Sequence, residues 1–319
     1  MRTLFVNNIH KRCGVYQYGL RLANCLPMCV HKEVSGEEDF LKAVVEIQPE
    51  KIIYNYHYIT MGWLNRSNIS IGREFCRRRS GHTLKNVGIL HLDGWDISEE
   101  LRSSFDEILD IDPLKTNGIP RPLFYEIPTT IKNPNHESFI TYNRGPDVPI
   151  FGSFGFAFKQ KGFDKIIRSV NEQYDDAIIK LIMPMAHYCG GGGGLNEVVA
   201  KCFSIERKPG IELIISNDFF ENEDLLYFLN SNTMNLFLYD SEKGRGVSSV
   251  LDYALSVDVP IGISNSDMFR NIYDDSICVY KNKLSDIMKI SISKKFREIY
   301  TKQSIIDLLI GKEALTSNL

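Results

Sequence analysis

The sequence predicts an α/β fold of two domains, each with a parallel β-sheet covered by helices on both faces. The chain has 319 residues, which is more than one hydrophobic core usually holds. Short apolar runs alternate with amphipathic segments along the chain, and the alternation restarts after a proline-bearing segment at 128–148. Because the strands are apolar on both faces, we expect parallel sheets with helices on either side.

The first half begins with an apolar run, a turn-prone loop and a helical pattern. Acidic residues in the first turn indicate a second helix, and β-branched and aromatic residues indicate a buried strand after it. We expect strands at 3–7, 51–58, 86–92, 105–111 and 121–127, and helices at 15–26 and 37–48.

The second half repeats this rhythm of strand and helix without repeating the sequence. These elements predict an N-terminal domain, 1–145, a second domain, 146–295, and a helical tail, 296–319. Two such domains facing one another would surround a shared cleft with strand ends and loops, where open parallel sheets bind ligands. We expect strands at 149–155, 177–185, 211–216 and 234–240, helices at 163–174, 195–206 and 222–231, and a loop, helix and strand within 244–264.

Composition and charge exclude several classes of protein. The 37 basic and 40 acidic residues give a net charge of −3, so we expect no nucleic-acid partner. The seven cysteines form no CxxC pair and no zinc-ligand spacing, which favours reduced thiols in the cytoplasm. The first residues lack a signal-peptide core, and no stretch approaches the ~20 apolar residues of a membrane span. Any membrane contact would therefore be peripheral, at the inner membrane face.

One basic run, residues 72–82, holds four arginines and one glutamate. Such a run could meet an anionic lipid surface or a phosphate-bearing acceptor. The alternative, which we favour, is a solvated face.

The segment GRGVSSV, residues 244–250, gathers small side chains and one cation at the start of a predicted helix. Free backbone amides there, with the charge of Arg245 and the hydroxyls of Ser248 and Ser249, suit a phosphate or diphosphate near Gly246. The alternative is that Ser248 only caps the helix. We expect this helix to be amphipathic, with Val250, Leu251, Ala254 and Leu255 on its buried face and Asp252 and Ser256 away from it.

A second candidate anion site lies in residues 152–170, where a strand runs into a turn with Gly155, Lys159, Lys161 and Gly162 before a helix. A lysine ammonium is a good point-charge partner for phosphate oxygens, and glycine lets the backbone approach closely. The alternative is an exposed basic turn.

Two further loops follow predicted strands of the first half. Gly14 precedes the first helix, at the carboxyl end of the first strand. The strand GILHLDGWD delivers His91 and Asp93 into a loop with Trp95, where a histidine and a carboxylate permit general-base work or recognition of sugar hydroxyls. The alternatives are a plain loop and a structural histidine.

The order of these pieces resembles the GT-B glycosyltransferases, especially the large retaining group that uses nucleotide-sugar donors. The likeness covers most of the chain. In that group the first loop bears glycine, as CGVYQYG does here, and an N-terminal strand ends in a histidine, as GILHLD does. In that group the second domain opens with a strand, a Gly-Arg turn and a Lys-Gly pair. Here Gly155 matches the glycine of the turn and Lys161-Gly162 matches the pair, but Phe156 stands in place of the arginine.

The resemblance implies two Rossmann-like domains facing a cleft and an enzyme that moves a sugar from a nucleotide-sugar donor to a glycan, glycolipid or lipid-linked acceptor, as in polysaccharide biosynthesis. It implies a donor-binding C-terminal domain, an acceptor-binding N-terminal domain, retention of configuration, no metal and no cofactor beyond the donor substrate. We expect donor contacts from Gly14, Gly155, Lys161, Gly246, Ser248 and Ser249, and catalytic roles for His91, Asp93 and Arg245.

One departure from the group leaves other functions open. Two positions that hold glutamates in the group hold Arg245 and Tyr253 here, although Glu242 and Asp252 lie close in sequence. The alternatives are a non-catalytic GT-B-like subunit that binds a glycan or nucleotide, and a nucleotide-sugar epimerase. Donor turnover, with and without acceptor, separates the three.

Overall fold

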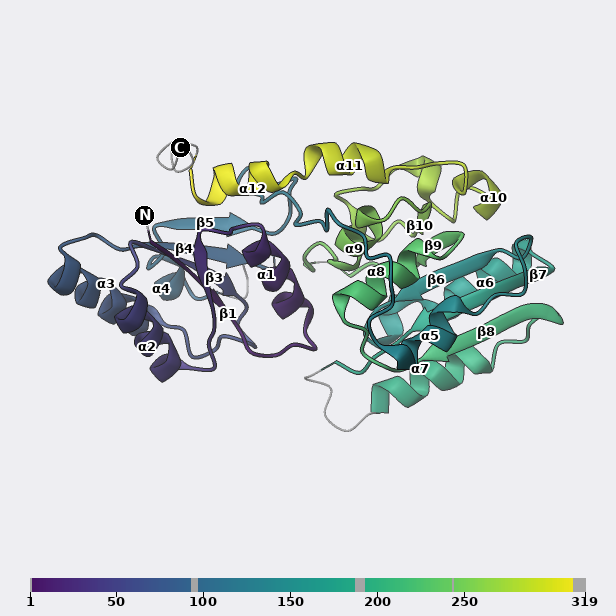
Figure 1. The fold of residues 1–319 in the computed structure, drawn as a ribbon, viewed down its shortest axis with the longest axis horizontal. Coiled ribbons are helices and arrows are strands. Elements are labelled where there is room, and N and C mark those ends of the chain that lie inside the picture. Colours follow the sequence, from purple (N-terminus) through teal and green to yellow (C-terminus); the bar gives the residue numbers. More distant parts are fainter. Residues whose placement is uncertain (1, 93–96, 187–192, 243, 312–319) are drawn as a thin grey trace. The chain divides into compact units, whose positions relative to one another are not determined.

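A computed structural model describes residues 2–92, 97–186, 193–242 and 244–311 (Figure 1). The chain forms two compact units. Unit 1 comprises Met1–Pro122, Gly244–Val247 and Tyr300–Leu319, and unit 2 comprises Leu123–Lys243 and Ser248–Ile299. The described residues contain no helix that is both long and apolar enough to cross a membrane.

The first boundary between the units lies after Pro122, earlier than the boundary expected near 145. The intervening segment belongs to unit 2 because its polar groups bond there. The backbone N–H groups of Lys132 and Asn133 donate to the Asp224 carboxylate, at 2.6 and 3.1 Å, and Arg144 pairs with Glu212 at 3.5 Å. Pro134 begins helix α5 (Pro134–Thr141) within this segment, so the prolines did not mark the boundary itself.

Unit 1 contains a five-stranded parallel sheet in the order β2-β1-β3-β4-β5. Its strands are β1 (Thr3–Asn7), β2 (Cys29–Glu33), β3 (Lys51–Tyr56), β4 (Lys85–Leu90) and β5 (Glu107–Asp110). Its helices are α1 (Gly14–Asn24), α2 (Glu37–Ile47), α3 (Arg66–Ser80), α4 (Glu99–Arg102) and α12 (Lys302–Leu309).

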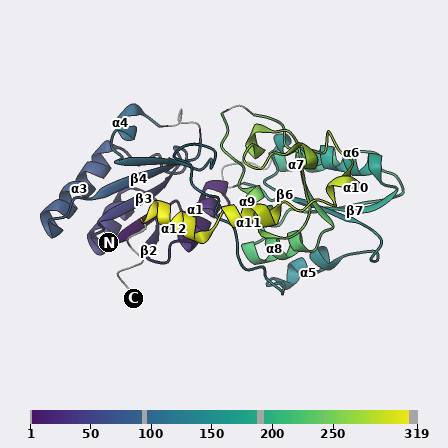
Figure 2. The same ribbon diagram turned by 90° about the horizontal axis from the view of Figure 1, so that it is seen from above.

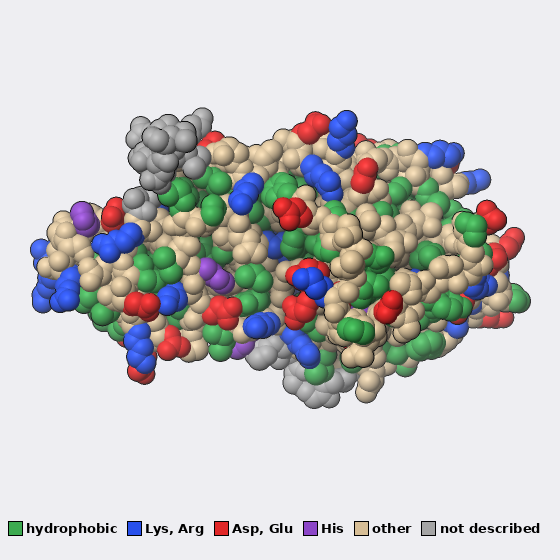
Figure 3. Space-filling model, viewed as in Figure 1, with side chains coloured by type: hydrophobic (Ala, Val, Ile, Leu, Met, Phe, Trp, Pro, Cys, Tyr) green, Lys and Arg blue, Asp and Glu red, His purple; other side chains and the backbone are tan. Residues whose placement is uncertain are grey.

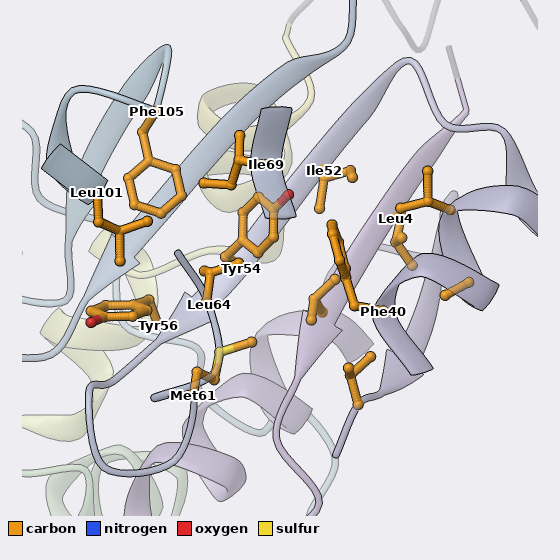
Figure 4. Close-up of a cluster of buried hydrophobic side chains, with 14 of the residues drawn as sticks. Leu4, Phe40, Ile52, Tyr54, Tyr56, Met61, Leu64, Ile69, Leu101 and Phe105 are labelled. Atoms are coloured by element: carbon orange, nitrogen blue, oxygen red, sulfur yellow. The ribbon is translucent and has the colours of Figure 1, made fainter. Parts of the chain in front are cut away.

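The central strands of unit 1, β1, β3 and β4, are buried on both sides, so their side chains alternate between two cores. Leu4 and Ile52 point into the core formed with α2 and α3, shown in Figure 4 with Phe40 of α2 and Ile69 of α3. Phe5 points into the opposite core, which is formed with α1 and α12. Both ribbon views show α1 and α12 close together (Figures 1 and 2).

The expected C-terminal tail contains residues of two helices that belong to different units, and α12 belongs to unit 1. Ile305 and Leu309 are fully buried in the core of unit 1, and the Lys51 ammonium donates to the Leu309 carbonyl oxygen near the end of the helix. The preceding helix, α11 (Ser293–Ile299), belongs to unit 2 and packs against α9 (Val250–Ser256). The described residues of the expected tail, 296–311, are therefore divided between the two units and do not form a separate element.

Unit 2 contains a second five-stranded parallel sheet, in the order β10-β9-β6-β7-β8. Its strands are β6 (Ile150–Phe154), β7 (Asp176–Ile182), β8 (Gly210–Ser216), β9 (Met234–Phe237) and β10 (Ile261–Ile263). Its remaining helices are α5 (Pro134–Thr141), α6 (Phe163–Gln173), α7 (Gly193–Phe203), α8 (Asn222–Asn230) and α10 (Leu284–Ile287), with short 3₁₀ turns that include η1 (Lys159–Lys161).

The predicted fold class is confirmed: each unit is a Rossmann-like, parallel α/β layer structure. The expected strand at 121–127 is wrong, because this segment is irregular. Pro120 and Pro122 remove backbone donors at its start, which disfavours a place in a central ladder.

Each sheet has one point at which the strand order reverses. It lies between β1 and β3 in unit 1 and between β6 and β9 in unit 2. Open parallel sheets bind ligands outside the carboxyl ends of their strands at such a point. Ligand binding is therefore expected at the residues that follow β1 and β3 in unit 1 and at those that follow β6 and β9 in unit 2.

Candidate functional sites

In unit 2, Gly155 follows β6 and Tyr239 follows β9, at the reversal of strand order. The two residues are close: a Cβ built on Gly155 would lie 3.3 Å from the Tyr239 hydroxyl oxygen. Loop residues after β10 close the other side, because the Ser264 hydroxyl donates to the Tyr239 carbonyl oxygen at 2.7 Å and Phe269 packs on the Tyr239 ring. Tyr239 is thus the centre of this edge of the sheet.

Lys161 reaches the same tyrosine from the loop after β6. Its ammonium lies 3.9 Å from the centroid of the Tyr239 ring, in the range of a cation–π contact. The following residue, Gly162, has φ +63°, and a Cβ there would lie 1.9 Å from the Leu238 carbonyl oxygen. Only glycine fits this close approach, so Gly162 fixes the loop that presents Lys161.

The Tyr239 hydroxyl is buried, and no described residue forms a hydrogen bond of good geometry with it. Burial raises the pKa of Tyr239, and the nearby Ser248 hydroxyl opposes that effect. Ser153, in β6, also has a buried hydroxyl without a partner among the described residues. Unpartnered buried hydroxyls are costly, so this edge of the sheet has spare hydrogen-bonding capacity for a ligand.

Ser248 and Ser249 do not cap a helix with their side chains. Helix α9 begins after Ser249 and has only seven residues, and no side-chain cap hydrogen bond forms at its start. The expectation of an amphipathic helix is also wrong, because every residue of α9 is buried, including Asp252 and Ser256. The helix is enclosed by α8 and α11. The expectation of an exposed helix N-terminus at this position is therefore wrong. The Ser248 hydroxyl is nevertheless close to the Tyr239 hydroxyl.

Arg245 and Gly246 belong to unit 1, whereas Lys161, the other expected donor-binding cation, belongs to unit 2. A Cβ on Gly246 would lie 2.1 Å from the His91 carbonyl oxygen, so the absence of a side chain lets this segment lie directly on the residue after β4. Arg245 is exposed, and its charge acts on His57. The predicted site residues therefore fall into two groups, one in each unit.

His91 is buried at the carboxyl end of β4. Its Nε2 atom lies 2.6 Å from Oδ1 of Asn55, and its ring meets Tyr18 edge-on at 5.2 Å between centroids. Burial holds the pKa of His91 well below its ordinary value, with further lowering by His57 and Arg121. The imidazole is therefore neutral at pH 7, so one of its ring nitrogens is able to accept a hydrogen bond or, as a general base, a proton.

His57, which follows β3, is a residue that the sequence did not single out. Its ring lies 6.4 Å from that of His91 between centroids and stacks on Tyr58. Burial and, second, the charge of Arg245 lower its pKa to about 4. In the sequence His57 stands inside an aromatic, β-branched run and has the pattern of a strand residue, so only its place after the last strand residue could have indicated it.

Gly14 is the first residue of α1, after Cys13, and no side chain caps this helix start. Asp93 and Trp95 lie outside the described residues, as do His187, Tyr188 and Gly190–192. The described part of the chain contains no group of three or more His, Cys, Asp or Glu side chains able to hold a metal ion.

Neither of the two positions that hold glutamates in the GT-B group carries a carboxylate here. Tyr253 is buried, donates to Oδ1 of Asn222 at 2.8 Å and packs against Phe124 and Phe154. Arg245 belongs to unit 1, where its charge acts on His57. Asp252, which lies close in sequence, is fully buried within α9.

Residues 72–80 of the basic run form the second half of α3, where Arg77 and Arg78 pair with Glu74, and Gly81 ends the helix. Figure 3 shows basic side chains at the edge of the molecule where α3 lies, and mixed charges over most of the visible face. The arrangement agrees with a solvated helix face.

No protein-family model matches the chain, and no curated protein matches its sequence. Solved structures do match over the whole length. Anabaena Alr3699/HepE in complex with UDP-glucose has a TM-score of 0.61 at 11% identity, over 99% of this chain and 100% of that chain. A glycosyltransferase from Rickettsia africae has a TM-score of 0.61 at 10% identity, over 99% of each chain.

Sucrose-phosphate synthase from Thermosynechococcus elongatus is similar as well, with a TM-score of 0.60 at 10% identity over 99% of each chain. These structural neighbours are GT-B glycosyltransferases. The chain therefore has the GT-B fold. The predicted resemblance is confirmed for the fold. Sequence identities of 10–11% show a shared fold and not a shared function.

Proposed function

We propose that this chain is a glycosyltransferase that moves a sugar from a nucleotide-sugar donor to an acceptor hydroxyl. The observation that carries the proposal is the convergence of Gly155, Lys161 and Ser248 on Tyr239, at the reversal of strand order in unit 2. The end-to-end fold match to a UDP-glucose complex supports it.

Unit 2 is proposed to bind the donor. The Lys161 ammonium offers a positive charge for the diphosphate, and the buried Tyr239 and Ser153 hydroxyls, which form no hydrogen bond of good geometry with the described residues, offer hydrogen bonds. Gly155 lets the diphosphate approach the backbone. In the reaction the bond between the anomeric carbon and the phosphate oxygen breaks, and its electron pair stays with the nucleoside diphosphate. Charge develops on that oxygen, so a preplaced ammonium stabilises the transition state more than the ground state.

Unit 1 is proposed to bind the acceptor through the residues that follow β3 and β4. His57 and His91 are neutral at pH 7, so they exchange hydrogen bonds with hydroxyl groups and do not attract a carboxylate by charge. The acceptor oxygen bonds to the anomeric carbon, and its proton leaves to the diphosphate or to water. Retention of configuration and independence from metal are parts of the same proposal. Proton NMR of the anomeric product and assays in EDTA test them.

The non-catalytic alternative has one observation in its favour. Tyr253 occupies a position that holds glutamate in the GT-B group, and its hydroxyl is committed to Asn222. A binding subunit would retain affinity for a nucleoside diphosphate but would neither transfer the sugar nor hydrolyse the donor. An epimerase would convert the donor with no acceptor present.

The first experiment measures thermal stability against nucleoside diphosphates and nucleotide sugars, with and without magnesium. A ligand at 100 times its Kd adds about 2.7 kcal/mol, which is visible as a raised Tm. We expect one nucleotide series to stabilise the wild type and to lose this effect in Lys161→Ala. The matched control is Lys159→Ala, because Lys159 lies in the same short turn and its ammonium is directed to Glu197, at 2.6 Å, whereas that of Lys161 lies over the Tyr239 ring.

Equal stabilisation of Lys161→Ala and the wild type would remove Lys161 from the donor site. If no nucleotide stabilises the wild type, the donor proposal fails for unit 2. If a nucleotide series binds, donor turnover is then measured with a panel of acceptors, and its complete absence would favour the non-catalytic alternative.

A further inference from the structure

Two buried asparagines connect His91 to helix α1. Asn7 ends β1 and Asn55 lies in β3, and both side chains are fully buried. Nδ2 of Asn55 donates to Oδ1 of Asn7 at 2.9 Å and to the Val15 carbonyl oxygen at 2.8 Å. Nδ2 of Asn7 donates to the Tyr16 carbonyl oxygen at 3.1 Å. Each amide group is therefore held at more than one point.

These partners decide which way the amide groups point. A carbonyl oxygen only accepts hydrogen bonds, so the amide nitrogens must face Val15 and Tyr16 of α1. Oδ1 of Asn55 consequently faces His91, whose Nε2 atom is 2.6 Å away. Since this oxygen only accepts, Nε2 of the neutral His91 must carry the proton. Its Nδ1 atom is then left with a lone pair.

Gly19 makes room for the two amides. It lies within α1, where a glycine costs about 1 kcal/mol relative to alanine, so it needs a packing reason. A Cβ there would lie 2.3 Å from Nδ2 of Asn55 and 2.7 Å from Oδ1 of Asn7. These distances are too short for any side chain. The helix, the two asparagines and His91 therefore form one continuous polar contact through the interior of unit 1.

We propose that Asn55 is a positioning residue that holds His91 as the Nε2–H tautomer, so that Nδ1 accepts a hydrogen bond from a substrate hydroxyl. Asn7 holds Asn55 in turn, and Gly19 permits the contact. The substrate part of this inference rests on the proposed function, whereas the tautomer does not. The same principle operates where an outer partner of a histidine decides which ring nitrogen is available.

The test uses the full chain with ¹⁵N-labelled histidine, and the variant His91→Gln identifies the His91 signals among the seven histidines. We expect a protonated, pyrrole-type Nε2 and an unprotonated, pyridine-type Nδ1 in the wild type at pH 7. Asn55→Leu removes the acceptor, so it should give a mixture of tautomers. A protonated Nδ1 in the wild type would overturn the proposal, as would unchanged His91 signals in folded Asn55→Leu.

The matched control is Asn235→Leu in unit 2. Asn235 is also a buried strand amide, pairing with Asn232 at 2.9 Å beneath Gly152, and its loss should leave the His91 signals in place. If Asn55→Leu does not fold, Gly19→Ala is the second variant, because its methyl group displaces the Asn55 amide. The wild-type tautomer is decisive in either case.

Kinetics separate this inference from the proposed function. Outer partners of metal-ligating histidines are worth about 10- to 100-fold, and by analogy kcat for sugar transfer should fall by a similar factor in Asn55→Leu while KM for the donor is unchanged. Unchanged kcat in the folded variant would overturn the positioning role and leave the transfer function standing. The expected tautomer without sugar transfer from any donor would overturn the proposed function and leave the tautomer assignment standing.

Discussion

The Tyr239 ring has the Lys161 ammonium over one face, 3.9 Å from its centroid, while its hydroxyl is buried without a well-formed hydrogen bond in the described residues. One tyrosine thus carries both a cation contact and an unmet polar group. A purely structural tyrosine in a core gains nothing from that combination, because a phenylalanine would fill the same space without the cost of the hydroxyl.

Tyr239→Phe should therefore stabilise the free protein and weaken donor binding. Removal of an unpartnered buried hydroxyl is expected to raise the free energy of unfolding by about 1 kcal/mol, measured by urea denaturation. The control is Tyr253→Phe, which removes a hydroxyl bonded to Asn222 and should lower the free energy of unfolding by about the same amount. A loss of stability in Tyr239→Phe would show that its hydroxyl is already satisfied in the free protein.

The low pKa of His57 predicts a pH dependence of stability. Its pKa is about 4 in the folded chain against an ordinary 6.5, so the unfolded chain takes up a proton first as the pH falls. The contribution of His57 is complete above pH 6.5 and is lost as the pH falls toward 4. His57→Asn should flatten the fall in the free energy of unfolding across this window, measured by denaturation at a series of pH values.

Arg245→Gln should raise the pKa of His57 only part of the way, because burial is the larger cause and remains. An NMR titration of the His57 ring measures this shift. Full recovery to 6.5 would make Arg245 the dominant cause, and no change would place its charge too far away to act.

Gly246→Ala should move the segment 244–247 off the residue after β4. The added Cβ would lie 2.1 Å from the His91 carbonyl oxygen, so the backbone has to shift, and overpacking of this kind costs about 1–3 kcal/mol. Gly36→Ala is the control, since a Cβ there meets nothing within 4 Å. Denaturation of both variants is the measurement, and equal stabilities would contradict the contact.

Leu309→Ala should destabilise unit 1 by about 2–5 kcal/mol, because the side chain is fully buried in the core formed with α1. Leu308 precedes it in α12 and is 38% exposed, so Leu308→Ala should cost much less. Urea denaturation, followed by a probe in each unit, measures both changes. A similar loss of free energy of unfolding in Leu309→Ala and Leu308→Ala would show that burial of the Leu309 side chain does not hold α12 on unit 1.

The sequence was sufficient for the fold class and for most elements, because apolar strands and amphipathic helices carry a local signal. Strand β2 (Cys29–Glu33) was not predicted, since it lies at the sheet edge and is half-exposed, with a mixed polar pattern. The strand expected at 121–127 had the apolar pattern but prolines at its start. Local patterns also misplaced the domain boundary, which depends on where Asp224 and Glu212 lie in space.

The candidate sites were predicted only in part. Gly155 and Lys161 were predicted as site residues because glycine and lysine after a strand form a local pattern, and the structure places both near Tyr239. Tyr239 was not, since a tyrosine after an apolar run has the pattern of a core residue. The contact between Asn55 and His91 joins residues 36 positions apart, and no spacing rule announces it. The return of Arg245 and Gly246 to unit 1 is likewise a property of the folded chain.

The place of α12 has a consequence for how the protein is made. Lys51 and Leu309 are 258 positions apart, yet they meet where α12 ends, and Ile305 completes a core that begins with Phe5. A ribosome finishes every residue of unit 2 before it adds α12. Until α12 is made, the earlier half of the chain keeps one apolar face of its sheet uncovered, which is when a chaperone would have most to bind.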